Sequence, residues 1–254
     1  MAILAGSGKR LSTDDGIPYM WQSGDVYTEP TSVGIGSTTS SNGTSDDAFG
    51  FSVSIGGTVI VAGAPYKQVG SFANQGLSYI FDLNGNEVGI ITASDGVAND
   101  NFGYSVAAAC GKIVVGAPKH NSNSNSDQGA AYIYDYDGTN EVKLIASNGA
   151  SYDAFGTSVA VGSGRIVVGA YDNDINGNAN QGAVYIYDLD GNEVGIITAS
   201  DGAPNDEFGN SVAVGEGKIV GGSPRRNSNS VIDSGAIYIY NTQKFDHILD
   251  ILDK

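Results

Sequence analysis

The chain has 254 residues, enough for one all-β domain with a sizeable core and without a second domain. Its formal net charge of −16 argues against nucleic acid or an anionic membrane as a partner, because both would repel it. Its 37 glycines and two methionines are typical of a turn-rich β protein, and its single cysteine excludes an intrachain disulfide.

The N-terminal residues 1–36 are interpreted as an arm or anchor preceding a repeat domain at 37–254. Residues 1–20 contain no apolar stretch of signal-peptide length, and no segment could span a bilayer. Ser32–Gly36 is similar to Glu87–Ile91, and Thr39–Gly43 aligns with Thr92–Gly96. A strand equivalent therefore precedes the first full repeat, either as a latch for the last unit or as an edge covered by a partner.

The rest of the chain repeats with a period of 53 residues. This step relates the Phe-Gly pairs at 49–50, 102–103, 155–156 and 208–209, and it also relates four Tyr-Ile-aromatic triplets that begin at Tyr79, Tyr132, Tyr185 and Tyr238. We place the repeats at about 42–94, 95–147, 148–200 and 201–254. A constant long period predicts that each unit is one supersecondary piece that buries its apolar faces against its neighbours.

Each unit reads as four short strands. In the second unit, Tyr104–Ala109 and Lys112–Gly116 flank a Cys110–Gly111 turn, and Gly129–Asp135 alternates small and aromatic residues as a half-buried strand does. Asp-Gly at 137–138 is a strong hairpin signal and leads into a fourth strand at 141–146. No window has a helical period free of glycine, although the tail at 245–252 is ambiguous.

Four antiparallel strands per unit, repeated radially, predict a four-bladed β-propeller with an N-terminal extension. A stacked solenoid is disfavoured, because such folds have shorter repeats and parallel strands. Four blades are the lower limit for a ring. Closure within one chain, completion by a second chain, and a partial blade from a neighbour's arm all stay open.

The pattern Asp-x-Phe-Gly-x-Ser-Val occurs four times, at 47–53, 100–106, 153–159 and 206–212, and Gly-Ala-Pro or a variant follows it. This pattern resembles the FG-GAP repeat, the blade of the integrin α-subunit propeller and of bacterial and viral surface proteins. The resemblance implies an adhesion or recognition propeller displayed outside a cell. Integrin-like members usually have seven blades and an acidic calcium loop at the position of the tight turn here, so those calcium sites are not carried over.

The residues of the pattern have scaffold explanations of their own. Phe beside Gly lets a large ring pack between blades while the backbone passes close. The Asp is suited to accept backbone N–H groups in its turn, and Ser fits a crowded inner strand. We therefore expect the recurring residues to be structural, and we look for function where the units differ.

The loops between the second and third strands differ most. They are expected to emerge on one face and to form a composite surface for a glycan or a protein, with simple solvation as the alternative. The candidate ligand residues on this surface are Tyr66, Phe72, His120, Asn121, Arg225 and Arg226.

One of these loops has a partial calcium pattern. Asp172, Asp174 and Asn176 precede Gly177 with the spacing of the first half of an oxygen-rich Ca²⁺ loop. No closing acid follows, so a weak Ca²⁺ site and an ordinary Asx turn are both compatible with the sequence. Calcium is the one cofactor that the sequence suggests.

A catalytic site is not expected. His120 and His247 occur in one unit each, Cys110 lies at a variable turn position, and no nucleophile–base pair can be assembled. We predict a non-catalytic recognition propeller on a phage virion, in a tail, fibre or surface protein, that contacts a host-surface glycan or protein. The alternatives are a purely structural virion subunit, a fragment of a secreted bacterial adhesin, and a glycan-active enzyme with paired carboxylates. A homo-oligomer is compatible with each.

Overall fold

The structure is a computed structural model that describes residues 11–12, 18–19, 37–228 and 231–242. The chain divides into two compact units, Met1–Ser37 and Thr38–Lys254. In the first unit, β1 (Leu11–Ser12) pairs antiparallel with β2 (Pro18–Tyr19). The strand equivalent predicted at Ser32–Gly36 and the ambiguous tail at 245–252 lie outside the described residues. No helix in the described part is long and apolar enough to cross a bilayer.

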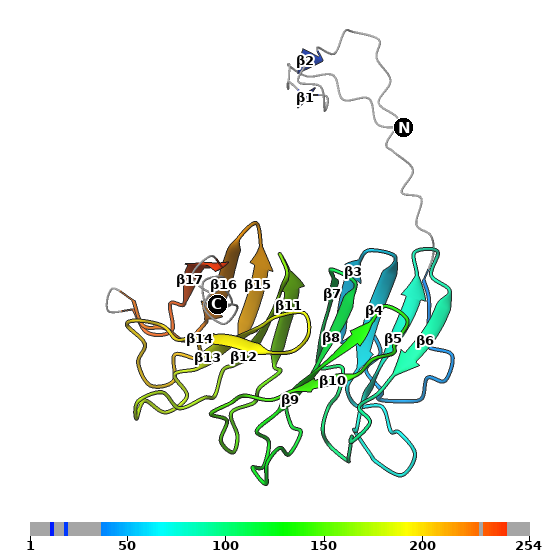
Figure 1. Cartoon of the computed structure of the whole chain (residues 1–254), viewed down its shortest axis with the longest axis horizontal. Helices are drawn as coiled ribbons and strands as arrows, with labels where there is room; N and C mark the ends of the chain where they lie inside the picture. The colour runs from blue at the N-terminus through cyan, green and yellow to red at the C-terminus, as the bar shows by residue number, and fades with distance from the viewer. Residues whose placement is uncertain (1–10, 13–17, 20–36, 229–230, 243–254) are drawn as a thin grey trace, which may run out of the picture. The chain divides into compact units, whose positions relative to one another are not determined.

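The second unit contains four antiparallel sheets, one for each repeat (Figure 1). The first sheet has β3 (Ser52–Gly56), β4 (Val59–Ala64), β5 (Leu77–Asp82) and β6 (Glu87–Ile91), each paired with the next. The second has β7 (Ser105–Ala109), β8 (Lys112–Ala117), β9 (Ala130–Asp135) and β10 (Val142–Leu144), so its fourth strand is shorter than the predicted 141–146.

The third and fourth sheets repeat this order. The third has β11 (Ser158–Gly162), β12 (Arg165–Ala170), β13 (Ala183–Tyr187) and β14 (Glu193–Ile197). The fourth has three strands within the described residues, β15 (Ser211–Gly215), β16 (Lys218–Ser223) and β17 (Ala236–Asn241). The prediction of an all-β fold built from blade-like antiparallel units is confirmed.

Glycine and asparagine turns explain why the strands pair with their sequence neighbours. The turn between β7 and β8 has positive φ at Cys110 (53°) and Gly111 (80°), which matches the twist of a tight hairpin. The predicted Asp-Gly hairpin at 137–138 forms too, and Asn84-Gly85 and Asp190-Gly191 form the equivalent hairpins of the first and third sheets. In each of these pairs only the glycine has positive φ, and in the first and third sheets a bulge in the strand register follows the pair. These hairpins therefore use a longer turn than the two-residue type.

The first strands β3, β7, β11 and β15 contact one another in chain order, which sets the sheets side by side. In Figure 1 these strands lie at the middle of the row, with β17 at the left and β6 at the right. We call the contact between two consecutive sheets a joint. Each of the three joints is filled by its own apolar cluster, which contains Phe102, Phe155 or Phe208, all fully buried. The predicted role of the Phe-Gly ring is confirmed.

Glycine beside the phenylalanine permits this packing. Gly103 has φ of +90°, and a Cβ built there would lie 2.6 Å from the carbonyl oxygen of Leu77 in the preceding sheet. The phenylalanine ring meets the edge of the tyrosine in its own sheet, with 5.2 Å between the centroids of Phe155 and Tyr185.

Candidate functional site

The loops that follow β4, β8, β12 and β16 cover residues 65–76, 118–129, 171–182 and 224–235. We call the surface that they form the loop face. They leave corresponding ends of adjacent sheets, and in Figure 1 the loops of the first three sheets lie together below the strands. The loop face is where the sequence placed its candidate ligand residues.

Most acids near this face are engaged in a recurring scaffold. The aspartate before each Phe-Gly pair accepts a backbone N–H three residues earlier, as from Val97 to Asp100 (2.8 Å). It also accepts from a side chain twenty residues later, which differs in each repeat. These pairs are Lys67 to Asp47 (2.8 Å), His120 to Asp100 (2.8 Å), Asn173 to Asp153 (2.6 Å) and Arg226 to Asp206 (3.3 Å).

Two of the candidate ligand residues therefore lie in structural positions. His120 is 4% exposed, and Arg226 joins Asp206 to Asp201, with 3.0 Å to the Asp201 carboxylate. A second recurring contact brings in Asp201, which accepts the hydroxyl of Tyr238 (2.8 Å) as Asp95 accepts that of Tyr132 (2.8 Å). Together, these contacts hold the loop that follows the second strand, and the tyrosine on the third strand, to the turn that precedes the first strand of the same sheet.

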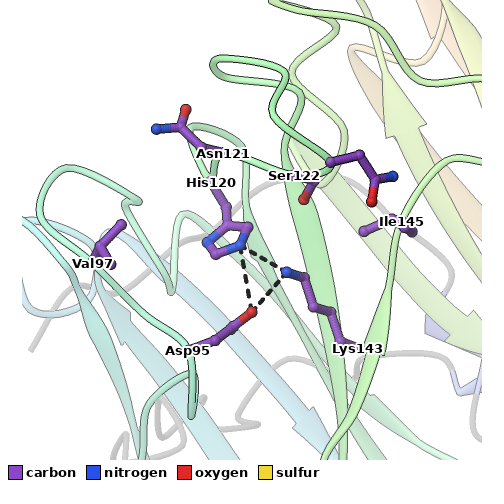
Figure 2. A pocket seen from close by; sticks show the side chains of 8 residues that line it. Asp95, Val97, His120, Asn121, Ser122, Lys143 and Ile145 are labelled. Atoms are coloured by element: carbon purple, nitrogen blue, oxygen red, sulfur yellow. Dashed lines mark hydrogen bonds and ion pairs between the residues drawn. The ribbon is translucent and has the colours of Figure 1, made fainter.

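A pocket of about 450 Å³ opens beside His120. Figure 2 shows His120 and Lys143 converging on Asp95, with 2.7 Å from Lys143 Nζ to Asp95 Oδ2 and 2.7 Å from Nζ to His120 Nε2. Both contacts of the ring are satisfied when Nδ1 donates to Asp100 and Nε2 accepts from Lys143. We call this the His120 pocket; its lining is Asp95, Val97, His120, Asn121, Ser122, Asn123, Lys143 and Ile145.

The charges in the His120 pocket are mutually compensated. Burial opposes ionisation of Asp95, but the hydrogen bonds from Lys143 and Tyr132 outweigh it, so the pKa of Asp95 lies below its ordinary value. The Asp95 side chain is 46% exposed and that of Lys143 is 30% exposed. Because its charged groups already have partners, this pocket offers a ligand mainly the rim formed by Asn121 and Asn123.

A second hollow of about 520 Å³ lies where the first strands of the sheets meet. Tyr104, Thr157 and Asn210 each directly precede a first strand, so the repeat brings these three positions together. We call this the central hollow; its lining is Tyr104, Thr157, Tyr171, Asp172, Asn180, Glu207, Asn210 and Arg225. Its walls are mostly polar groups, and its residues differ from one repeat to the next.

The central hollow combines an ion pair with a partly buried carboxylate, Asp172, which is hydrogen-bonded to the neighbouring Tyr171. Arg225 lies 3.0 Å from the carboxylate of Glu207, and its side chain remains 60% exposed. Burial raises the pKa of Asp172 above its ordinary value, and the nearby Glu207 carboxylate adds to this effect. Burial, together with the charge of Asp172, raises the pKa of Tyr171 to about 12, which keeps its phenol protonated as a donor.

Exposed aromatic rings lie beside this hollow and on the first loop of the loop face. The ring of Phe51 lies 4.9 Å from that of Tyr104 and 6.0 Å from that of Tyr66, measured between centroids. Phe51 is 47% and Tyr66 41% exposed. Phe72, at the tip of its loop, is 43% exposed and closes a small turn with Val69. An apolar platform therefore adjoins the polar hollow.

The sequence-based candidates divide between the two sites. Tyr66 and Arg225 lie at the central hollow or its aromatic margin, and Asn121 lines the His120 pocket. Phe51, Tyr104, Tyr171 and Glu207 were not among the candidates predicted from the sequence. A position-by-position comparison along the 53-residue period contains the signal, because 51, 104, 157 and 210 are occupied by Phe, Tyr, Thr and Asn.

The three calcium-ligand candidates have different structural environments. Asp174 Oδ1 accepts the backbone N–H of Asn180 (2.8 Å), the same contact that Asn121 makes with Asp127 (2.9 Å) in the preceding repeat. Asp172 instead lines the central hollow, and Asn176 has φ of 52° in the turn. Among the residues that the structure describes, no three acids, histidines or cysteines group as metal ligands. Calcium at Asp172, Asp174 and Asn176 stays a prediction.

The repeats, the joints and the loop face define an all-β repeat protein built from propeller blades. The FG-GAP repeat family matches residues 36–81, 86–134, 139–187 and 192–240, and the chain belongs to this family. None of the curated proteins is similar enough in sequence to count as a relative. Among solved structures, the crystal structure of the computationally designed Ika4 protein is similar at 14% identity and a TM-score of 0.48, covering 78% of this chain and 93% of that chain.

Proposed function

We propose that the chain is a non-catalytic recognition protein that binds a carbohydrate at the central hollow. The observation that carries this proposal is the contrast between the recurring acids and the hollow. The recurring acids hold loops and turns together, whereas most residues of the hollow, such as Tyr104, Thr157 and Asn210, stand at positions whose residue type changes from repeat to repeat. A position that the fold does not depend on can change its residue type, and so form a binding site, without destabilising the protein.

The chemistry of the hollow suits a ligand rich in hydroxyl groups. The Asp172 carboxylate accepts hydrogen bonds, the Arg225 guanidinium donates them, and Asn180 and Asn210 do both. Tyr104, Phe51 and Tyr66 add aromatic faces on which the apolar face of a sugar ring can pack. A volume of about 520 Å³ falls within the range of small-ligand sites.

A glycan array probed with the labelled full chain tests this function. Tyr104→Ala and Arg225→Ala should each reduce binding at least tenfold, because each removes a contact from the wall of the hollow. Tyr152→Ala is the matched control, since Tyr152 is 64% exposed and lies outside the hollow. Equal losses in all three variants, or no glycan signal from the unaltered chain, would refute the proposal.

A structural role in a larger assembly is the second candidate. It is supported by apolar residues exposed at the ends of the row of sheets, Val53 and Ile55 on β3 and Ile237 and Ile239 on β17. Display on a virion, or on a bacterial surface as part of an adhesin, stays a prediction from the family resemblance. A chain that binds no glycan and associates only through these ends would favour the structural role.

A further inference from the structure

The three joints between sheets share one set of hydrogen bonds. In each joint the loop of one sheet accepts three backbone N–H groups from the turn that begins the next repeat. In the first joint these bonds run from Asn99 to Ala73 (2.9 Å), Asn101 to Asn74 (3.1 Å) and Phe102 to Gln75 (2.8 Å). The equivalent groups make the second and third joints, with lengths of 2.8 to 3.2 Å.

A serine completes each set. The hydroxyl of Ser52 donates to the carbonyl of Gly103 (2.8 Å), that of Ser105 to Gly156 (2.8 Å) and that of Ser158 to Gly209 (2.7 Å). The serine belongs to the first strand of one sheet, and the carbonyl belongs to the Phe-Gly pair of the next. Every joint therefore has two chemically distinct sides: one contributes the loop carbonyls and the serine hydroxyl, and the other contributes the N–H groups and the glycine carbonyl of the following turn.

Each end of the row of sheets presents one side of such a joint, without a neighbouring sheet in the same chain. On the fourth sheet, Ser211 occupies the serine position, and the carbonyls of residues 232–234 occupy the three loop positions. On the first sheet, the N–H groups of Asp46, Ala48 and Phe49 and the carbonyl of Gly50 occupy the opposite side. Over residues 37–228 and 231–242, none of these groups has the partner that its equivalents have.

Apolar residues that are buried inside the joints are exposed at the two ends of the row. Ile239 is 63% exposed on β17, whereas its equivalents Ile186 and Ile133 are 0% and 1% exposed inside joints. Val53 is 68% exposed on β3, and its equivalent Val106 is 9% exposed. The residue types at the ends are thus those of a buried joint, although within one chain they face outward.

We propose that a second copy of this chain docks head to tail, with the first sheet of each copy on the fourth sheet of the other. Two such joints close a ring of eight sheets. The contact is heterologous, because it joins two different surfaces, and two of them related by a twofold axis form a closed dimer. In Figure 1 β6 and β17 lie on opposite sides of the row, as a pair of half rings requires.

A second copy fits this surface better than an unrelated partner does. The donor turn of the first repeat already has the backbone conformation of its equivalents, with φ of 67° at Asp46 and 54° at Ala48 against 70° at Asn99 and 58° at Asn101. The acceptor loop of the fourth repeat likewise matches, with φ of 52° at Asp233 and 53° at Asn74. Docking would therefore reproduce the three joints within the chain without reorganising either surface.

The test is the mass of the full chain in solution, measured by light scattering during gel filtration. The expected mass is twice the 26.0 kDa of one chain. Val53→Lys on the first sheet and Ile239→Lys on the fourth should each return the mass to one chain, since a charge would be buried in the joint. Val88→Lys is the matched control, because Val88 is also exposed (60%) but lies on β6, away from the first strands.

The outcomes separate the alternatives. Both lysine variants replace exposed residues, so their circular dichroism should equal that of the unaltered chain. A single-chain mass for the unaltered protein at all concentrations would overturn the proposal and indicate that residues 1–36 or the tail cover the ends. A dimer that is lost in only one of the two variants would also overturn it, because that result indicates contact between two identical surfaces.

Discussion

Replacing Gly169 by alanine should destabilise the protein far more than the same change at Gly222, although the two glycines occupy equivalent positions. A Cβ at Gly169 would collide with the carbonyl oxygen of Gly209 in the next sheet and with the hydroxyl of Ser158. A Cβ at Gly222 would meet only the hydroxyl of Ser211, which is exposed and can rotate away. The difference comes solely from the presence of a following sheet.

The size of the effect at Gly169 follows from three contributions. Overpacking in a joint costs about 1–3 kcal/mol, and the lost hydrogen bond from Ser158 costs about 1 kcal/mol. Reduced freedom of the unfolded chain returns about 0.4–1 kcal/mol. The net loss is about 1–4 kcal/mol, or roughly 2–14 °C in melting temperature for a domain of this size. For Gly222→Ala only the last contribution remains, so the melting temperature should stay level or rise by about 2 °C.

Thermal unfolding followed by circular dichroism measures both variants. The Val53→Lys background is used for each, so that association between copies does not contribute. Equal shifts at the two positions would refute the reasoning, since it attributes the cost to the neighbouring backbone. A shift below about 2 °C for Gly169→Ala would mean that the joint relaxes easily and is not close packed.

Two buried aspartates should respond to neutralisation with opposite signs. Burial raises the pKa of Asp153, so its charge destabilises the fold at neutral pH, and Asp153→Asn should raise the melting temperature at pH 7 but not at pH 3. At Asp47 the hydrogen bonds from Lys67 and Thr44 outweigh burial and lower the pKa; its stabilisation is present above about pH 4 and lost as pH falls. Asp47→Asn should therefore cost about 1–3 kcal/mol at pH 7, with a smaller cost in acid, and equal signs for the two variants would contradict this assignment. His120→Asn should cost little in urea unfolding, because asparagine fills the same role at 173, whereas Asp100→Ala should cost about 2 kcal/mol by orphaning the donors of Val97 and His120.

The period of 53 residues was sufficient to predict the units, their four-strand plan and the burial of Phe102, Phe155 and Phe208, because turns and strand alternation are local properties. The role of the aspartates in accepting backbone N–H groups was also predictable from their turns. Their second partners were not, since Lys67, His120, Asn173 and Arg226 differ chemically and lie twenty residues away across a loop. The central hollow was missed for a similar reason: it collects single residues from several repeats, and only the packing of first strands brings them together.

The repeating unit and the residues that build it therefore follow from the amino-acid sequence alone, since each hairpin depends on residues close along the chain. The role of each copy of a residue, in contrast, depends on how the sheets pack against one another. Val53 and Val106 stand in the same motif, yet one is exposed and the other buried. The hydroxyl of Ser158 donates a hydrogen bond to the next sheet, whereas Ser211 is exposed on the fourth sheet. Whether such a residue is buried depends on whether another sheet packs against it, and that depends on the position of its repeat in the row.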